Sequence, residues 1–209
     1  MAVASYDILS FDGFLAHWAV ERPDWAALSQ DDHHFTYGQL EERTAKIVAM
    51  LLGLGLKKGD RIAWIGKNSD LYFALFYGAA RIGVVTVPVG WRLAPAEWAY
   101  IAKDTGARIL FAGQGFEAGV HALARDIAGV DRVIPEEEAR DMIDATARIA
   151  FEPAGPDDAV LQLYTSGTTG NPKGAVLSNR NLFALRKNAA EEAHAYSKWE
   201  DDEVVLIAM

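Results

Sequence analysis

The sequence predicts an α/β fold with a mainly parallel β-sheet covered by helices. Short apolar runs such as RIAWIG and VVTVPV lack polar alternation, which is typical of strands buried on both faces. Segments of ten or more residues with helical signals separate these runs, as the crossovers of a parallel sheet require. Hydrophobic residues form 51% of the 209 residues, which is enough for one sizeable core.

Helix start signals set the order of the expected elements. Thr36 with Gln39 forms the signature of a capping box, Asn68 or Ser69 can cap a second helix, and Pro95 is typical of a first helical turn. In chain order we expect a helix over 36–53, a strand over 61–66, a helix over 68–83, a strand over 84–89, a helix over 95–104, a strand over 107–112, a helix over 116–128, a strand over 130–135, a helix over 136–148, strands over 159–165 and 173–178, a helix over 179–196 and a strand over 203–209.

One apolar stretch, from Leu71 to Val89, is long enough to cross a membrane. Arg81 lies at its middle, where a charge would cost roughly 2.5–3.5 kcal/mol in a bilayer. Gly83 and Pro88 divide the stretch into a helix-like half and a β-branched half. We therefore predict a buried helix followed by a buried strand, and no transmembrane segment.

Composition excludes several functions. The net charge of −9 argues against a nucleic-acid partner, because binding to a phosphate backbone needs a surplus of Lys and Arg. The chain has no cysteine, which excludes thiol nucleophiles, disulfides and thiolate metal sites and fits a reducing compartment. The start MAVASYDILSFDGF has no basic segment followed by an apolar run, so we expect a cytoplasmic protein.

A loop rich in glycine and hydroxyl residues, TSGTTGNPKG, follows the strand AVLQLY. Gly167, Gly170 and Gly174 permit positive φ and let backbone N–H groups approach an anion. Lys173 supplies a positive charge. Hydroxyl groups that can donate to phosphate oxygens or contact a magnesium ion come from Thr165, Ser166, Thr168 and Thr169. This inventory predicts a site for a polyphosphate.

The loop differs from a Walker loop, which runs from a lysine directly into a helix. Here Gly174 and the β-like AVLS follow Lys173, so the loop joins two strands. A flexible hairpin turn is the plain alternative, although ordinary hairpin turns need only about two to five residues.

YTSGTTGNPKGAVLSNRNL resembles the phosphate-binding signature of the adenylate-forming, AMP-binding enzymes, which include acyl-CoA synthetases, peptide-synthetase adenylation domains and luciferases. The likeness continues upstream through FTYGQLEERTAKIVAMLLGLGLKKGDRIAWIGKNSD and starts at about Phe11. WRLAPAE is similar to the fatty-acyl-CoA synthetase branch. The resemblance implies that the chain is part of the large N-terminal domain of such an enzyme.

The resemblance also implies a reaction. A carboxylic acid, expected to be a fatty acid, would attack ATP to give acyl-AMP and pyrophosphate, and coenzyme A would then displace AMP. The residues that match the family's ATP-binding loop are Thr165, Ser166, Gly167, Thr168, Thr169, Gly170 and Lys173. Thr165 would also contact Mg²⁺. Asn179 and Gly90 depart from the family pattern, since many members carry histidine and asparagine there.

The organisation along the chain follows from these assignments. We expect a front portion over 1–150, a linker over 151–158 and a phosphate-loop portion over 159–209. The chain stops within the apolar run EVVLIAM, so we expect a fragment of a longer protein. By the resemblance, the C-terminal domain with its catalytic lysine would follow residue 209, and the fragment alone would be inactive.

Other interpretations stay open. Gly113, Gly115 and Ala118 fit a dinucleotide-binding pattern with Glu136 as the ribose partner, which would indicate an oxidoreductase module. A non-catalytic nucleotide-binding protein is a third class, and the chain could form a homodimer. The polar run DDHH over 31–34 could ligate a metal, but its place before a helix cap favours a solvated turn. Trp91 and Arg92 could organise the acyl side of a site or serve only packing.

Overall fold

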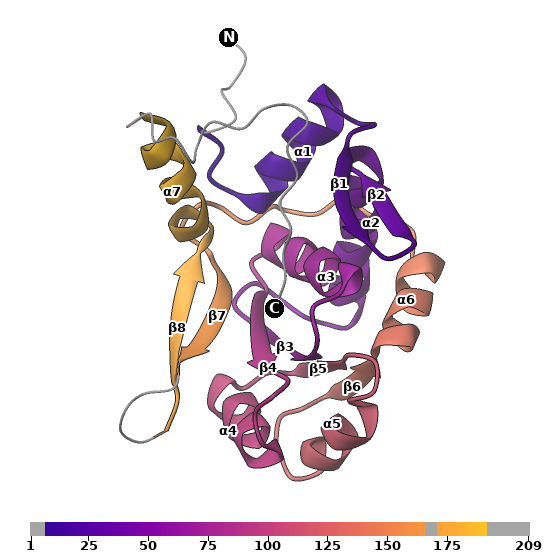
Figure 1. Cartoon of the computed structure of the whole chain (residues 1–209), viewed down its shortest axis with the longest axis vertical. Coiled ribbons are helices and arrows are strands. Elements are labelled where there is room, and N and C mark those ends of the chain that lie inside the picture. The colour runs from indigo at the N-terminus through magenta and orange to yellow at the C-terminus, as the bar shows by residue number, and fades with distance from the viewer. Residues whose placement is uncertain (1–6, 166–170, 192–209) are drawn as a thin grey trace.

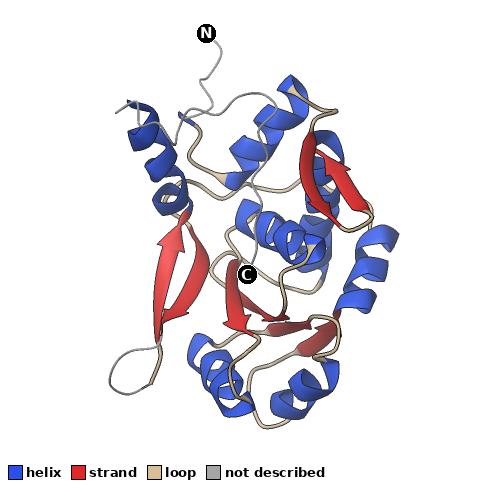
Figure 2. Cartoon of the chain, viewed as in Figure 1, coloured by secondary structure: helices blue, strands red, loops and turns tan. Residues whose placement is uncertain are grey.

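The computed structural model describes residues 7–165 and 171–191, which form a six-stranded sheet with helices on both faces and a separate two-stranded hairpin (Figures 1 and 2). The helices are α1 (Phe11–Glu21), α2 (Tyr37–Gly53), α3 (Asp70–Arg81), α4 (Pro95–Thr105), α5 (Glu117–Ala124), α6 (Glu136–Ala145) and α7 (Asn179–Glu191). The strands are β1 (Ala26–Gln30), β2 (His33–Thr36), β3 (Arg61–Gly66), β4 (Val85–Gly90), β5 (Ile109–Ala112), β6 (Arg132–Pro135), β7 (Ala159–Thr165) and β8 (Lys173–Ser178).

The strand order in the large sheet is β6-β5-β3-β4-β7-β8. The chain starts this sheet at β3, adds β4 on one side, and then adds β5 and β6 on the other. All neighbours are parallel except β7 and β8, which form an antiparallel pair at one edge. The predicted mainly parallel α/β fold is therefore confirmed. The carboxyl ends of β3, β4, β5 and β7 meet at one end of the sheet, where open α/β sheets bind their ligands.

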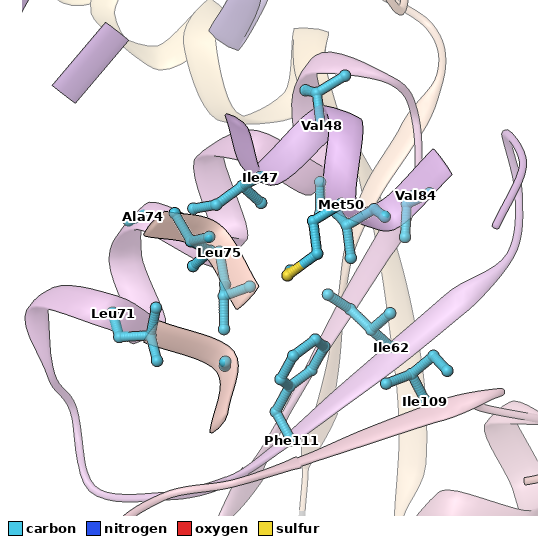
Figure 3. Packing of buried hydrophobic residues seen from close by; sticks show 14 of the residues in the cluster. Ile47, Val48, Met50, Ile62, Leu71, Ala74, Leu75, Val84, Ile109 and Phe111 are labelled. Carbon is cyan, nitrogen blue, oxygen red and sulfur yellow. The ribbon is translucent and has the colours of Figure 1, made fainter. Parts of the chain in front are cut away.

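Apolar cores cover the sheet on both faces. Residues of β3 alternate between them: Ile62 packs with α2, α3 and α6, whereas Ile65 packs with α4 and α5. Figure 3 shows Ile62 and Phe111 of the strands directed toward Met50 and the α3 side chains. Burying a side chain of this size contributes roughly 1.5–3 kcal/mol to stability, so these layers hold the parallel strands together.

The predicted helix caps are mostly confirmed. Thr36 Oγ1 accepts from Gln39 N at 3.3 Å, and Gln39 Oε1 accepts from Thr36 N at 2.9 Å, completing the capping box. Of the two candidates before α3, Ser69 is the cap, because its Oγ accepts from Tyr72 N at 3.1 Å. Pro95 begins α4, as expected.

The stretch from Leu71 to Val89 is a buried helix followed by a buried strand, as predicted. Arg81 at the end of α3 is only 4% exposed. Its guanidinium donates to Asp12 Oδ1 at 2.8 Å and to Glu41 Oε1 at 3.2 Å. Within the described part of the chain, every helix is too short or too polar to traverse a bilayer.

Some elements differ from the prediction. Helix α1 and the β1–β2 hairpin were not expected, because both are short and mostly only half-buried and so carry weak periodicity. The predicted turn over DDHH holds for Asp31 and Asp32 but is wrong for the two histidines, which lie in β2. Helix α5 is shorter than predicted, and the expected strand over 203–209 lies outside the described residues.

Candidate functional site

The β7–β8 hairpin carries Thr165 and Lys173, the two described residues among those predicted to bind the phosphates of ATP. In its antiparallel register Thr165 pairs with Lys173, where the hairpin opens. Both side chains are exposed. The structure therefore brings the threonine hydroxyl and the lysine cation to opposite ends of the loop. The other predicted site residues lie outside the described part of the chain: Ser166, Gly167, Thr168, Thr169 and Gly170.

This hairpin lies where a ligand site is expected on such a sheet. Thr165 is the last residue of β7. Because β7 pairs in parallel with β4, Thr165 lies at the same end of the sheet as the carboxyl end of β4. A hydroxyl oxygen is a donor type that Mg²⁺ accepts, and Lys173 complements phosphate charge. Thr165 thus fits the role of one magnesium ligand beside a polyphosphate, with Lys173 opposite.

Gly174 lies within β8, inside the strand predicted over 173–178, and is not among the described glycines with positive φ. The positive φ that glycine permits is therefore not used at this position. A Cβ at this position would lie 2.5 Å from Gln162 Nε2 and 2.9 Å from Tyr164 Cζ. Gly174 therefore makes room for the Tyr164 ring, which covers its backbone across the strand pair.

Tyr164 was not among the predicted site residues, although it directly precedes Thr165. Its hydroxyl donates to Asp104 Oδ2 of α4 at 2.5 Å and accepts from Gln162 Nε2 at 3.1 Å. Burial, with the hydrogen bond to Asp104, raises the pKa of Tyr164 above its ordinary value, so the hydroxyl stays protonated. The sequence offered one signal for this residue, a tyrosine hydroxyl directly before the predicted phosphate loop.

A second group of side chains lies at the same end of the sheet, where the carboxyl ends of the parallel strands meet. Trp91 and Arg92 follow β4, and the Arg92 guanidinium carbon lies 4.0 Å from the centre of the Trp91 ring. Lys67 follows β3, and its Nζ lies 5.4 Å from the centre of the same ring. The ring also meets Phe116 edge-on. Stacking accounts for how these side chains are held, and the suggestion that they line an acyl site stays a prediction.

Comparison with known proteins settles the family. A family model described as AMP-binding enzyme matches residues 15–209. The chain belongs to the AMP-binding enzyme family. A fatty acid–[acyl-carrier-protein] ligase, ScoC of Streptomyces coeruleorubidus, is 35% identical over 91% of this chain and 37% of its own length. A long-chain-fatty-acid–CoA ligase, FadD13 of Mycobacterium tuberculosis, is 35% identical over 76% of this chain and 32% of its own length.

Solved structures agree with this assignment. A fatty acyl CoA synthetase of Mycobacterium tuberculosis superposes with a TM-score of 0.80 and 29% identity over 88% of this chain and 37% of that one. The chain thus spans about a third of the length of these three proteins. The predicted membership of this family, and a fold like the N-terminal part of its members, are confirmed.

The dinucleotide-binding alternative is not supported. Glu136, the expected ribose partner, instead accepts from Gln114 N at 3.1 Å and from Arg140 Nη2 at 2.8 Å. At Gly66, a Cβ would lie 2.8 Å from Gly113 Cα, so these two glycines allow neighbouring strand ends to touch. The glycines and the glutamate serve the fold of this AMP-binding domain.

Asn179, which departs from the family pattern, has a structural role here. It is fully buried at the start of α7. Its Oδ1 accepts from Phe11 N at 3.3 Å, and its Nδ2 donates to Gly155 O at 3.1 Å. Asn179 therefore joins α1 and the 151–158 segment to the helix that follows the hairpin. The division of the chain at that segment stays a prediction.

Proposed function

We propose that this chain supplies the pyrophosphate-binding part of an AMP-forming acid–thiol ligase. The observation that carries the proposal is the register of the β7–β8 hairpin, in which Thr165 and Lys173 are opposite each other at the mouth of the family's phosphate loop. Both groups are exposed at the end of the sheet where the carboxyl ends of the parallel strands meet, which is where α/β proteins bind ligands. A hydroxyl and a cation at this place suit a nucleoside triphosphate.

The proposed chemistry has two steps. A carboxylate oxygen bonds to the α-phosphorus of ATP while the bond from that phosphorus to the bridging oxygen breaks, so pyrophosphate leaves with its electron pair. Lys173 and the loop hydroxyls hold the departing phosphates, and their positive charge and N–H and O–H donors stabilise the charge that develops there. Bound Mg²⁺, held in part by Thr165, would neutralise phosphate charge.

The second step is transfer of the acyl group to a thiol with release of AMP. We propose coenzyme A as the acceptor and a fatty acid as the substrate. The relatives named above support a fatty acid, and they divide over the acceptor, since one is named for an acyl carrier protein and the other for CoA. The thiol acceptor is accordingly the part of the proposal that most needs measurement.

The test is acid-dependent exchange of labelled pyrophosphate into ATP by the gene product that contains this chain, with a panel of fatty and aromatic acids. Exchange with fatty acids supports the proposal, and thioester formation with CoA or with an acyl carrier protein then identifies the acceptor. MgATP binding with no exchange for any acid would overturn it in favour of a non-catalytic nucleotide-binding protein.

Variants of the hairpin test the site itself. Lys173→Ala should lower kcat/KM for MgATP by about 10- to 100-fold, because a charge-assisted hydrogen bond contributes roughly 1.5–3 kcal/mol. Thr165→Val should lower it by a smaller factor, and both variants should unfold at the same temperature as the wild type. Lys57→Ala, which removes an exposed lysine before β3, is the matched control. Unchanged kinetics in Lys173→Ala would refute the loop assignment.

A further inference from the structure

Helix α4 contacts both arms of the β7–β8 hairpin next to the phosphate loop. On the incoming arm, Tyr164 Oη donates to Asp104 Oδ2 at 2.5 Å. On the outgoing arm, Tyr100 Oη donates to the backbone oxygen of Pro172 at 3.3 Å. Tyr164 directly precedes Thr165, and Pro172 directly precedes Lys173. Helix α4 thus holds Tyr164 and Pro172, the residues directly before Thr165 and Lys173.

The two α4 residues are suited to act together. Tyr100 and Asp104 are four positions apart, so they lie on the same side of the helix. The helix itself is firmly placed. Its buried side chains include Trp98 and Ile101, and Trp98 Nε1 donates to Gly90 O at the end of β4 at 3.0 Å. Because α4 is held to the core and to β4, it can serve as a fixed reference for the hairpin.

The Tyr164 hydroxyl is held from a second direction as well. Gln162 Nε2 donates to it at 3.1 Å, and Gln162 Oε1 accepts from Arg61 Nε at 3.0 Å. The chain of hydrogen bonds therefore runs from the start of β3, through β7, to α4. The Tyr164 ring lies over Gly174, where an added Cβ would meet the ring and the Gln162 amide.

The outer strand of the hairpin has few apolar contacts near the loop. Among the described residues, β8 is at the edge of the sheet and pairs with β7 alone. Val176 in β8 is 47% exposed and Leu163 in β7 is 38% exposed, so apolar burial near the loop is small. Where burial is weak, a few side-chain hydrogen bonds decide the position of the backbone.

We propose that Tyr164, Asp104 and Tyr100 are positioning residues that set the two ends of the phosphate loop, and so place Thr165 and Lys173 for a bound polyphosphate. The inference rests on the proposed function and deepens it. None of the three side chains needs to touch the nucleotide. They act through the backbone at positions 164 and 172.

The test uses Asp104→Ala, Tyr164→Phe and Tyr100→Phe in the same gene product. A net hydrogen bond of this kind corresponds to a two- to tenfold change in affinity, so each variant should raise both the KM and the calorimetric Kd for MgATP by about that factor. The KM for the acid should stay the same. Asp104→Asn should restore much of the MgATP affinity, since an amide oxygen still accepts from Tyr164.

A double variant separates positioning from general damage. Asp104→Ala combined with Tyr164→Phe should bind MgATP no more weakly than Tyr164→Phe alone, because both substitutions remove the Tyr164–Asp104 hydrogen bond and Tyr164→Phe also removes the one from Gln162. Tyr100→Phe should add to either. Asp141→Ala, which removes an exposed carboxylate from α6 on the opposite face, is the control for charge.

The outcomes are decisive in both directions. A lower melting temperature and lower kcat with unchanged KM and Kd for MgATP would overturn the inference, since loss of folded protein would explain them. A raised Kd that Asp104→Asn restores would support it. MgATP binding is measured without acid, so this result stands apart from the exchange assay that tests the proposed function.

Discussion

The parallel strands β3–β6 and the β7–β8 hairpin belong to one sheet but are stabilised differently. The central strand β3 is almost entirely buried between apolar layers, whereas β7 and β8 expose Leu163 and Val176. The hairpin depends on hydrogen bonds to α4 and on one glycine that makes room for an aromatic ring. Stability therefore resides mainly in the parallel half, and the proposed chemistry in the half that is held least by burial.

The parallel half also buries charges. Arg81 joins α3 to α1 and α2, and Asp70 at the start of α3 is 1% exposed and accepts from Arg140 at 2.9 and 2.6 Å. Charges in such positions are costly unless they are paired. Substitutions there should act on unfolding, whereas substitutions in the hairpin should act on nucleotide binding.

The largest expected effect is at Arg81. Arg81→Met should lower the free energy of unfolding by about 3–5 kcal/mol, because it leaves the Asp12 and Glu41 carboxylates beside the core without this cation. Urea unfolding measures the change. Arg148→Met is the matched control: Arg148 is 56% exposed and also pairs with Glu41, so its loss should stay below about 1 kcal/mol. Equal effects of the two substitutions would contradict this account of the core.

The next effect is a pH dependence at Asp70. Burial opposes its ionisation, but the Arg140 guanidinium, with His33, outweighs burial and lowers the pKa from 3.8 to about 2. The ionised carboxylate therefore stabilises the fold above pH 3.8, and this contribution, about 2 kcal/mol, is lost as the pH falls toward 2.

Comparison with Asp70→Asn isolates this contribution. The difference in free energy of unfolding between wild type and variant should be largest near neutral pH and should shrink between pH 4 and pH 2. Urea titrations at several pH values measure it. A difference that does not change with pH would show that ionisation of Asp70 is unimportant.

The smallest change in stability is expected at Gly174, together with a clear change in MgATP binding. Gly174→Ala should lower the free energy of unfolding by less than about 1 kcal/mol, since the added methyl meets the movable ends of Gln162 and Tyr164. Displacing the Tyr164 ring should nevertheless weaken MgATP binding several-fold. Calorimetry and thermal unfolding on one sample test both parts. A large loss of stability with full MgATP affinity would contradict the view that the hairpin contributes more to nucleotide binding than to stability.

Much of the fold could be predicted because its signals are local. The apolar runs at β3 and β4, the Thr36–Gln39 capping box and Pro95 specify elements through neighbouring residues alone. Helix α1 and strands β1 and β2 could not be found in this way, because their positions depend on contacts with distant segments such as the pairing of Asp12 with Arg81.

The same division applies to the site. Thr165 and Lys173 could be proposed from the sequence because the loop concentrates glycine, hydroxyl and positive charge within a few residues, a local property of the chain. The contacts of Tyr100, Asp104 and Gly174, on which their proposed roles rest, were decided only by the tertiary structure. They depend on strand register and on a helix sixty residues away from Tyr164 in sequence, and no local pattern encodes such a contact.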